Sequence, residues 1–361
     1  MRHRIERGLL FVWPVLSLAI ILVVIAALIS LGPTLLQRVA TEALIRLIVV
    51  IGLYVFIGNS GIISLGHVSF MAIGAYSSAL MTIPPQMKKF VLDLPPFMTV
   101  LLLPAIPAAF IAAMVATLFA ILIGIPLMRL SGIAASMGTF AFLAIVYVVI
   151  SNWKAVTGGQ SALIGLPVYT NIWVALIYAM FALILAFAYQ HSRYGVRLRA
   201  SRENEVAALA TGINVRRERL IAFVVSAFIV SFGGVLHAHF IGVLSSSSFY
   251  LDVTFITLAM LVIGGMNSLA GAVIGTIVVS SLGELLRLME VGVDLGTLHL
   301  AAPRGLREVG LSFLMLLILL FRPQGLTSGK EFFLPSRMTR RFLAGNTTSS
   351  TSCARSRSHR R

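Results

Sequence analysis

The chain has 361 residues, of which 58% are hydrophobic and only 11% are charged, and its mean hydropathy is +0.98. An ordinary soluble domain carries about 25% charged residues, so this composition excludes one and indicates an integral membrane protein. The formal net charge of +16 is assigned to membrane orientation rather than to nucleic acid, because basic residues beside spans determine topology. The single cysteine, Cys353, excludes an internal disulfide framework and a cysteine-based metal site.

The first apolar run, residues 9–31 (LLFVWPVLSLAIILVVIAALISL), is longer than the roughly 20 residues that a helix needs to cross the hydrocarbon core. Such runs are too long and too evenly apolar for barrel strands, so the fold class indicated is an all-α polytopic membrane protein. Arg2, Arg4 and Arg7 precede the run, as in a signal peptide. Its length and the lack of a clear small-residue cleavage site predict a retained helix.

Hydropathy along the chain predicts about ten transmembrane helices, at residues 9–31, 41–57, 62–83, 97–127, 132–151, 171–190, 217–243, 251–264, 268–286 and 307–321. The fourth carries Pro104 and Pro107, which predict a kink near its outer end. Glycines punctuate residues 261–276 (LVIGGMNSLAGAVIGT), which predicts a broken or re-entrant helix there.

An even number of spans places both termini on one side of the membrane. With that side cytoplasmic, it holds three arginines before residue 9, Arg129, seven arginines from Arg193 to Arg219 and nine basic residues from Arg322 onward, which is 20 of the 28 Lys and Arg. The positive-inside rule therefore predicts cytoplasmic N- and C-termini.

The chain is expected to divide into a cytoplasmic N-terminus (1–8), a transmembrane permease domain (9–326) and a C-terminal tail (327–361). The transmembrane domain includes a cytoplasmic loop (191–216) and an outer loop (152–170). The tail is basic and is expected to be mostly disordered and able to contact anionic lipid.

The most polar stretch is RASRENEVAALATGINVRRER, residues 199–219. Within it, residues 203–211 predict a short amphipathic helix. Val206, Leu209 and Ala210 follow i, i+3, i+4 spacing, acidic residues lie in the first turn, and Gly212 follows the end. This helix can seat in a groove on a cytoplasmic partner, or it can be a solvated connector whose arginines only fix the topology.

Four segments together resemble the permease subunits of branched-chain amino acid ABC importers, and they occur in the order found in that family. They are SLGHVSFMAIGAYSSALM (64–81), TGGQSALIGLP (157–167), RASRENEVAALATGINVRRERLIAFVVSAFIVSFGGVLHA (199–238) and LLILLFRPQGL (316–326).

The resemblance implies a coupling helix that docks on an ATP-binding subunit and includes Arg202, Glu203, Asn204, Glu205, Ala207, Ala208 and Gly212. It also implies four further subunits: a second homologous permease, two cytoplasmic ATP-binding subunits and a periplasmic solute-binding protein. The assembly would lie in the bacterial inner membrane and work by alternating access. Thr157, Gly158 and Gly159 of the outer loop would lie near the place where the binding protein docks.

Small and polar residues collect in GNSGIISLGHVSFMAIGAY, residues 58–76. Such residues allow helices to approach closely, or allow a backbone to break where it lines a polar cavity. Both interpretations stay open. The candidates for lining a translocation pathway are Ser64, Gly66, His67, Phe70 and Gly74.

The sequence indicates no cofactor or metal bound by the chain itself. The only Gly-Lys pair, Gly329-Lys330, is followed by Glu331, so the chain has no phosphate-binding loop and ATP would be hydrolysed by partner subunits. His237 and His239 lie two residues apart on a predicted helix, where side chains point about 200° apart, and do not face one ion.

The cargo and the mode of energisation have alternatives. The family often has an acidic residue and a following arginine in the span before the outer loop, whereas residues 139–153 are uncharged. Relatives of that family also serve urea and short amides, so a related small polar solute is an alternative cargo.

An ion-coupled secondary transporter is the alternative mechanism. Such a transporter would need ionisable groups inside the membrane. The acidic candidates all fall near predicted span ends: Glu42, Asp252, Glu284, Glu290, Asp294 and Glu308. Arg46 follows Glu42 by one helical turn, so these two form a plausible structural pair. A third alternative, an intramembrane enzyme, would need a convergent catalytic set that the sequence does not show.

Overall fold

The computed structural model describes residues 2–91 and 101–291, and after these residues 293–294, 299–300, 303, 305–322 and 325–327. Eight helices in this described part are long and apolar enough to cross a membrane. Two shorter apolar helices accompany them, α3 (Val68–Thr82) and α15 (Leu306–Phe321). The chain is therefore an all-α polytopic membrane protein. Except for Thr327, the tail predicted at 327–361 lies outside the described residues.

The long helices follow the chain in a simple order, with short elements at their ends. They are α1 (Arg2–Ser30), α2 (Thr34–Ser60), α6 (Ala105–Leu127), α7 (Gly132–Asn152), α9 (Ile172–His191), α12 (Val215–Ile241), α13 (Leu251–Gly264) with the preceding 3-10 turn η1 (Ser246–Phe249), and α14 (Leu269–Val291). The short helices are α4 (Pro85–Val91), α8 (Lys154–Thr157), α10 (Arg193–Glu203) and α11 (Glu205–Ala210). Strand β1 (Leu163–Ile164) pairs antiparallel with β2 (Val243–Leu244), and β3 (Val293–Asp294) with β4 (His299–Leu300).

Each predicted span overlaps one of these helices, but three predictions need correction. Helix α2 begins at Thr34 rather than at residue 41, because Arg38 and Glu42 lower the hydropathy of turns that are nevertheless helical. Helix α6 begins at Ala105 rather than at residue 97, since Pro104 has an extended backbone before the first turn. Pro104 therefore precedes this helix, and Pro107 lies in its first turn, where proline is tolerated, so the predicted kink has no basis in either residue.

The glycine-rich segment 261–276 separates two helices. Helix α13 ends at Gly264, and Gly265 has a φ of +117°, a value that glycine adopts without a steric cost. Helix α14 then packs against α13 so closely that a Cβ on Gly275 would lie 1.9 Å from the carbonyl oxygen of Met260. The glycines thus form a tight helical hairpin.

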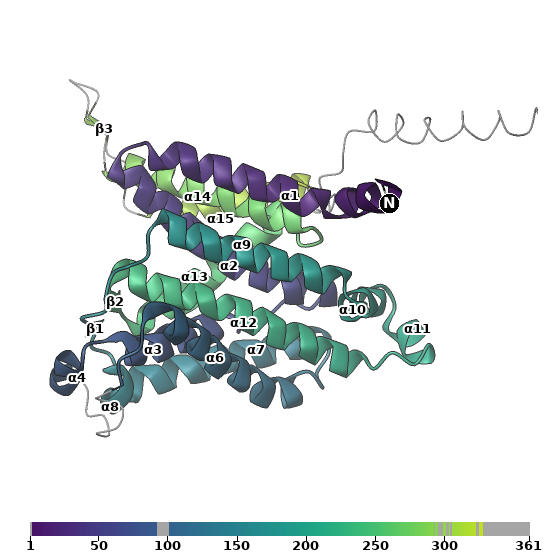
Figure 1. Ribbon diagram of the computed structural model, residues 1–361, viewed down its shortest axis with the longest axis horizontal. Coiled ribbons are helices and arrows are strands. Elements are labelled where there is room, and N and C mark those ends of the chain that lie inside the picture. Colours follow the sequence, from purple (N-terminus) through teal and green to yellow (C-terminus); the bar gives the residue numbers. More distant parts are fainter. Residues whose placement is uncertain are drawn as a thin grey trace, which may run out of the picture.

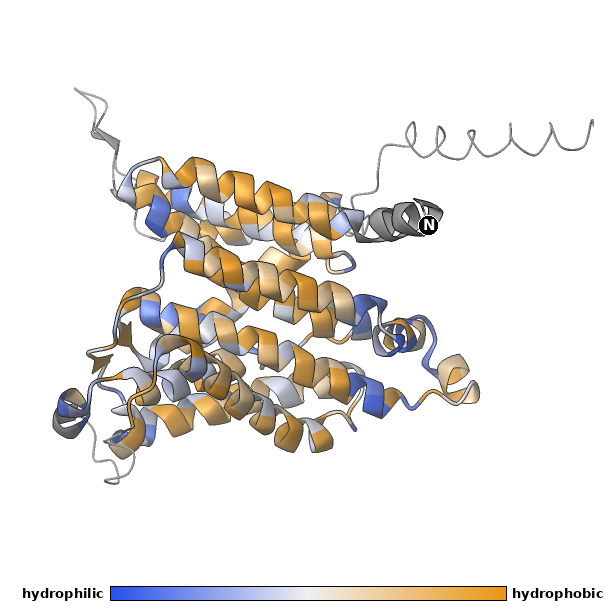
Figure 2. Cartoon of the chain, in the orientation of Figure 1, coloured by the Kyte–Doolittle hydropathy of each residue, from blue (hydrophilic) through white to orange (hydrophobic). Residues whose placement is uncertain are grey.

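The two ends of the bundle differ in composition. Helices α10 and α11 project at one end, which also holds the start of α1, whereas α4, α8, β1 and β2 lie at the other (Figure 1). Hydropathy is high along the long helices between them, and hydrophilic residues gather at α10 and the first turn of α12 at the first end and at α4 at the other (Figure 2). The positive-inside rule assigns the α10–α11 end to the cytoplasm. We call it the inner end and the opposite one the outer end.

Helices α2 and α12 form the core of the bundle. Residues 44–60 of α2 are all buried except Arg46, and α12 is buried on most of its surface. A Cβ on Gly234 of α12 would lie 1.9 Å from the carbonyl oxygen of Met71 in α3, so these two backbones are in contact. Small residues allow such close packing of helices within lipid. Large apolar side chains on the outer helices are exposed, as contact with lipid requires: Ile106, Met114, Leu118, Ile133 and Ile177.

Candidate functional site

Side-chain caps divide the inner loop into two short helices. Ser192 caps α10 by accepting a hydrogen bond from the Gly195 amide, at 3.3 Å. Asn204 is extended, and its Oδ1 accepts from the Ala207 amide at 3.0 Å, which starts α11. The single helix predicted over residues 203–211 is therefore wrong at its start. Glu203 ends α10, because the Asn204 side chain competes with the helical hydrogen bonds and begins a new helix.

Arginine side chains connect the inner loop to the membrane helices. The Arg219 guanidinium on α12 pairs with Glu205 of α11 at 2.9 Å. Arg202 on α10 donates to the carbonyl oxygen of Gly58, near the inner end of α2, at 2.7 Å. These arginines therefore do more than fix the topology, because they tie α10 and α11 to the two core helices.

Helix α11 presents apolar side chains to the inner aqueous side. Val206 is 78% exposed and Leu209 is 56% exposed, whereas Ala208 between them is buried. The helix projects beyond the other inner elements (Figure 1). After it, Gly212 has a φ of +83° and turns the chain back toward α12. The predicted apolar face therefore points away from the bundle. Glu203, Asn204, Ala207 and Gly212 are exposed beside it, and Arg202 and Glu205 are half-buried by their partners.

The residues proposed to line a pathway are buried in helix packing. The His67 ring has its Nδ1 2.7 Å from Ser64 Oγ and is surrounded by Phe56, Phe70 and Phe223. These five side chains are fully or almost fully buried.

Gly66 and Gly74 lie at close backbone contacts. A Cβ on Gly66 would lie 2.3 Å from the carbonyl oxygen of Thr139, and one on Gly74 would lie 2.6 Å from that of Ser231. The geometry therefore supports the packing interpretation for this chain taken alone. A pathway role for these residues and for the Ser64–His67 cluster stays a prediction.

The outer-loop residues lie at the end opposite α11. The Thr157 hydroxyl is buried and donates to the carbonyl oxygens of Ile150 and Trp153, at 2.6 and 2.8 Å. Gly158 and Gly159 follow with φ angles of +75° and +65°, which turn the chain after α8. The loop then supplies β1, which pairs with β2 just after α12. The outer loop is thus tied to the outer end of the core helix whose inner end holds Arg219.

The comparison with known proteins identifies the family. Residues 35–321 match the family described as the branched-chain amino acid transport system / permease component. The chain belongs to this family. The permease is 28% identical over 322 residues to the high-affinity branched-chain amino acid transport system permease protein LivM of Escherichia coli (strain K12). This alignment covers 80% of the present chain and 69% of LivM. It is 32% identical over 161 residues to LivH of the same strain, over 44% of this chain and 47% of that protein. No solved structure gives a significant match.

These findings make the chain the permease component of an ABC-type transporter, a multi-pass membrane transport subunit of the bacterial inner membrane. The four resembling segments fall within or overlap the matched residues, so the family resemblance read from the sequence is confirmed. The roles of individual site residues stay predictions.

Sequence reasoning missed a charged pocket near the outer end of the permease. The predicted Glu42–Arg46 pair is present, yet both residues lie inside α2 rather than at a span end. With Arg38 they lie one turn apart on a single face, and they meet Glu284 and Arg287 of α14 around a cavity. The i, i+4, i+8 spacing of three charges in one apolar span was the signal in the sequence.

Proposed function

We propose that the permease forms the translocation path of an ATP-driven importer together with a second homologous permease subunit. Two cytoplasmic ATP-binding subunits would supply the energy, and a periplasmic solute-binding protein would deliver the solute. The proposed cargo is a branched-chain amino acid, with a related small polar solute such as urea or a short amide as the alternative. The similarity to both LivM and LivH, each named as a permease of branched-chain amino acid transport, supports a paired arrangement.

The observation that carries this proposal is the exposed apolar face of α11. Val206 and Leu209 are exposed at the inner end of the chain, where nothing in the described residues covers them. An exposed apolar pair rimmed by charged residues favours a protein partner. Glu203 and Glu205 flank the face, so a partner with an apolar groove and basic rim would complement it.

The contacts of the inner loop suggest how docking would reach the membrane helices. Force on α11 would pass through the Glu205–Arg219 ion pair into α12. Force on α10 would pass through Arg202 into the carbonyl of Gly58 on α2. Because α2 and α12 are the core helices, movement of the ATP-binding subunits would act on the helices that hold the bundle together.

The test is co-purification of the permease with its ATP-binding subunits, in detergent, for wild type and for Val206→Asp/Leu209→Asp. These positions are exposed, so the double variant should fold normally and lose the ATP-binding subunits. The glutamates are poorer targets, because reversing Glu205 would also break its ion pair with Arg219. The matched control is Val168→Asp, at a position that is 64% exposed in the outer loop.

The coupling proposal predicts retention by wild type and by the control, with loss in the double variant. Full retention by the double variant would refute docking through α11. If wild type itself retains no ATP-binding subunit when all partners are present, the importer proposal fails. Solute uptake driven by a proton or sodium gradient, without ATP, would then favour the secondary transporter.

A further inference from the structure

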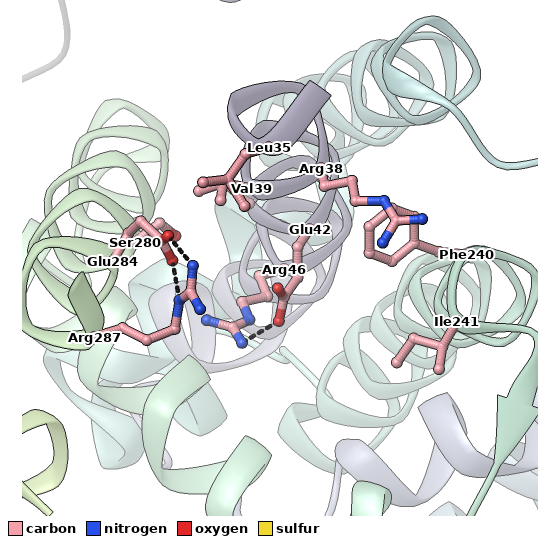
Figure 3. Close-up of a pocket in the computed structure, with 11 residues that line it drawn as sticks. Leu35, Arg38, Val39, Glu42, Arg46, Phe240, Ile241, Ser280, Glu284 and Arg287 are labelled. Carbon is pink, nitrogen blue, oxygen red and sulfur yellow. Dashed lines mark hydrogen bonds and ion pairs between the residues drawn. The ribbon is translucent and has the colours of Figure 1, made fainter. Parts of the chain in front are cut away.

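A cavity of about 420 Å³ lies between α2, α12 and α14 near their outer ends. This volume falls within the roughly 300–1,000 Å³ of small-molecule sites in proteins. Figure 3 shows the α2 side chains between those of α14 on one side and those of α12 on the other. The lining combines charged and apolar groups, which is unusual inside a bundle of this composition: Leu35, Arg38, Val39, Glu42, Ala43, Arg46, Phe240, Ile241, Ser280, Glu284 and Arg287.

Two ion pairs account for four of the five charged side chains. Glu42 Oε1 accepts from Arg46 on the next turn of α2. Glu284 accepts from both Nε and Nη2 of Arg287, at 2.9 and 2.5 Å. Charges at this depth are costly unless they are paired, and these pairs neutralise one another. The cluster of three arginines and two glutamates keeps an excess of one positive charge.

Two groups facing the cavity keep unused bonding capacity. Arg38 is exposed and makes no ion pair or side-chain hydrogen bond within the described part of the chain. Glu42 is the more exposed carboxylate, at 41% against 18% for Glu284, and among the described residues only its Oε1 is bonded. Arg38 and Glu42 lie one turn apart on the same face of α2. The cavity therefore offers a cation and a carboxylate oxygen side by side.

The remaining wall of the cavity is apolar. Leu35 and Val39 of α2 lie on the side of the cavity toward α14, and Phe240 and Ile241 close the opposite side from the last turn of α12 (Figure 3). Figure 3 shows Arg38 on the side of the cavity nearest Phe240. A ligand that fits must carry both charges and an apolar substituent.

We propose that this pocket is an outer binding site for a free α-amino acid with an aliphatic side chain. Arg38 would bind the carboxylate through its guanidinium, and Glu42 would accept from the ammonium group. The aliphatic side chain would lie against Phe240 and Ile241, on the side of the cavity where Arg38 lies (Figure 3). This assignment rests on the proposed function for its setting, and what it adds is a place in this chain where the substrate binds. An anionic lipid headgroup fits less well, because its phosphate would satisfy Arg38 but would offer no cationic group to Glu42.

The test is equilibrium binding of radiolabelled leucine to the full-length permease in nanodiscs of neutral lipid, without ATP-binding subunits or binding protein. Wild type should bind leucine saturably at millimolar or lower concentration. Arg38→Gln and Glu42→Gln should each weaken binding by about tenfold to a hundredfold, since each removes a hydrogen bond to a charged group. Arg129→Gln and Asp252→Asn serve as matched controls, because both positions are exposed and lie outside the pocket.

Leucine analogues test the site without any variant. Leucine methyl ester lacks the carboxylate and 4-methylpentanoate lacks the ammonium group, so neither should displace leucine from wild type. The proposal is overturned if wild type shows no saturable binding, if either analogue competes as well as leucine, or if both pocket variants bind like their controls. It is also overturned if urea or acetamide displaces leucine, or if Arg38→Gln only releases co-purified anionic lipid. Because no ATP-binding subunit is present, a failure of the coupling proposal leaves this result unaffected.

Discussion

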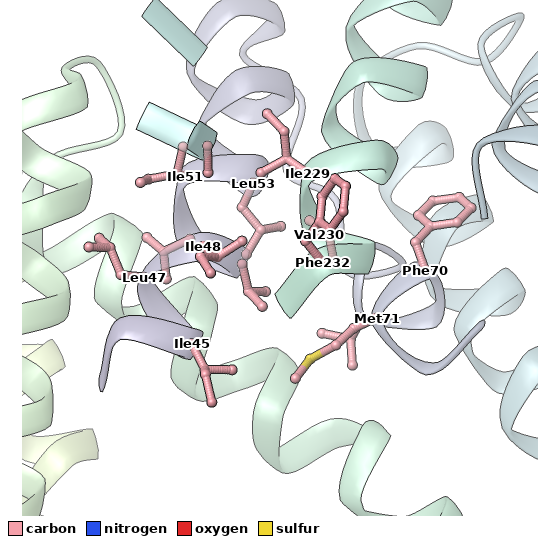
Figure 4. Close-up of a cluster of buried hydrophobic side chains, with 14 of the residues drawn as sticks. Ile45, Leu47, Ile48, Ile51, Leu53, Phe70, Met71, Ile229, Val230 and Phe232 are labelled. Carbon is pink, nitrogen blue, oxygen red and sulfur yellow. The ribbon is translucent and has the colours of Figure 1, made fainter. Parts of the chain in front are cut away.

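The crossing of α12 over α3 makes a sharp prediction for two adjacent glycines. A Cβ on Gly234 would lie 1.9 Å from the carbonyl oxygen of Met71, and a Cβ on Gly233 would lie 2.5 Å from the Val49 Cγ2 methyl. Figure 4 shows Met71 of α3 beside the Ile229–Phe232 turn of α12. A backbone carbonyl cannot move alone, whereas a methyl group can move by a change of side-chain torsion. Alanine should therefore be tolerated at Gly233 and not at Gly234.

The magnitude follows from the geometry. An ordinary Cβ contact is at least 3.4 Å, so Gly234→Ala requires α12 and α3 to separate by about 1.5 Å at their crossing. Overpacking of this kind costs about 1–3 kcal/mol, and a strained side-chain torsion at Val49 costs about 0.5–1.5 kcal/mol. Both variants gain the same ~1 kcal/mol from replacing glycine within a helix. We expect Gly234→Ala to be less stable than Gly233→Ala by about 0.5–1.5 kcal/mol.

The free energy of unfolding can be measured by SDS titration of the full-length chain in mixed micelles, followed by tryptophan fluorescence. Gly233→Ala is the matched control, because it lies in the same helix and has the same change in composition. Equal stability of the two variants, or a more stable Gly234→Ala, would refute the argument that backbone contact holds this crossing.

Two further predictions concern the inner loop. Asn204→Ala removes the side-chain cap of α11, which costs about 1 kcal/mol of helix stability. Hydrogen exchange at the Ala207 amide should therefore accelerate about fivefold. Unchanged exchange would contradict the capping role. Arg202→Leu removes the guanidinium that donates to the Gly58 carbonyl oxygen. A hydrogen bond from a charged group contributes about 1.5–3 kcal/mol. Leucine uptake should therefore fall about tenfold, while the ATP-binding subunits stay bound. Normal uptake would show that this contact does not transmit coupling.

The sequence predicted the membrane helices well because their signal is local. Apolar runs of about 20 residues identify themselves, and ten predicted ranges each overlap one helix. The errors came from the same averaging. Charged residues at 38 and 42 shortened the predicted α2, although paired charges on one helical face are compatible with a helix.

Features that depend on distant parts of the chain could not be predicted. The β1–β2 pairing joins Leu163 to Leu244, and the Arg202–Gly58 contact joins residues 144 positions apart. The outer pocket requires α2, α12 and α14 to converge, and no spacing within one segment encodes that. The apolar face of α11 was predicted from spacing, but only the packing of α10 and α12 shows that it points outward.

Helix α12 relates the two proposed sites physically. It begins at Val215, directly after the inner loop, and ends at Ile241 in the wall of the outer pocket. Its 27 residues give a length of about 40 Å, enough to span the bilayer core as one rigid element. The contacts at Gly233 and Gly234 fix this helix close to the pocket, while Arg219 connects it to α11 at the other end. A tilt of α12 about the glycine crossing would therefore move the inner end far and the pocket wall little. Coupling through this helix would change which end of the path is open while leaving the amino acid contacts at Phe240 and Ile241 nearly intact.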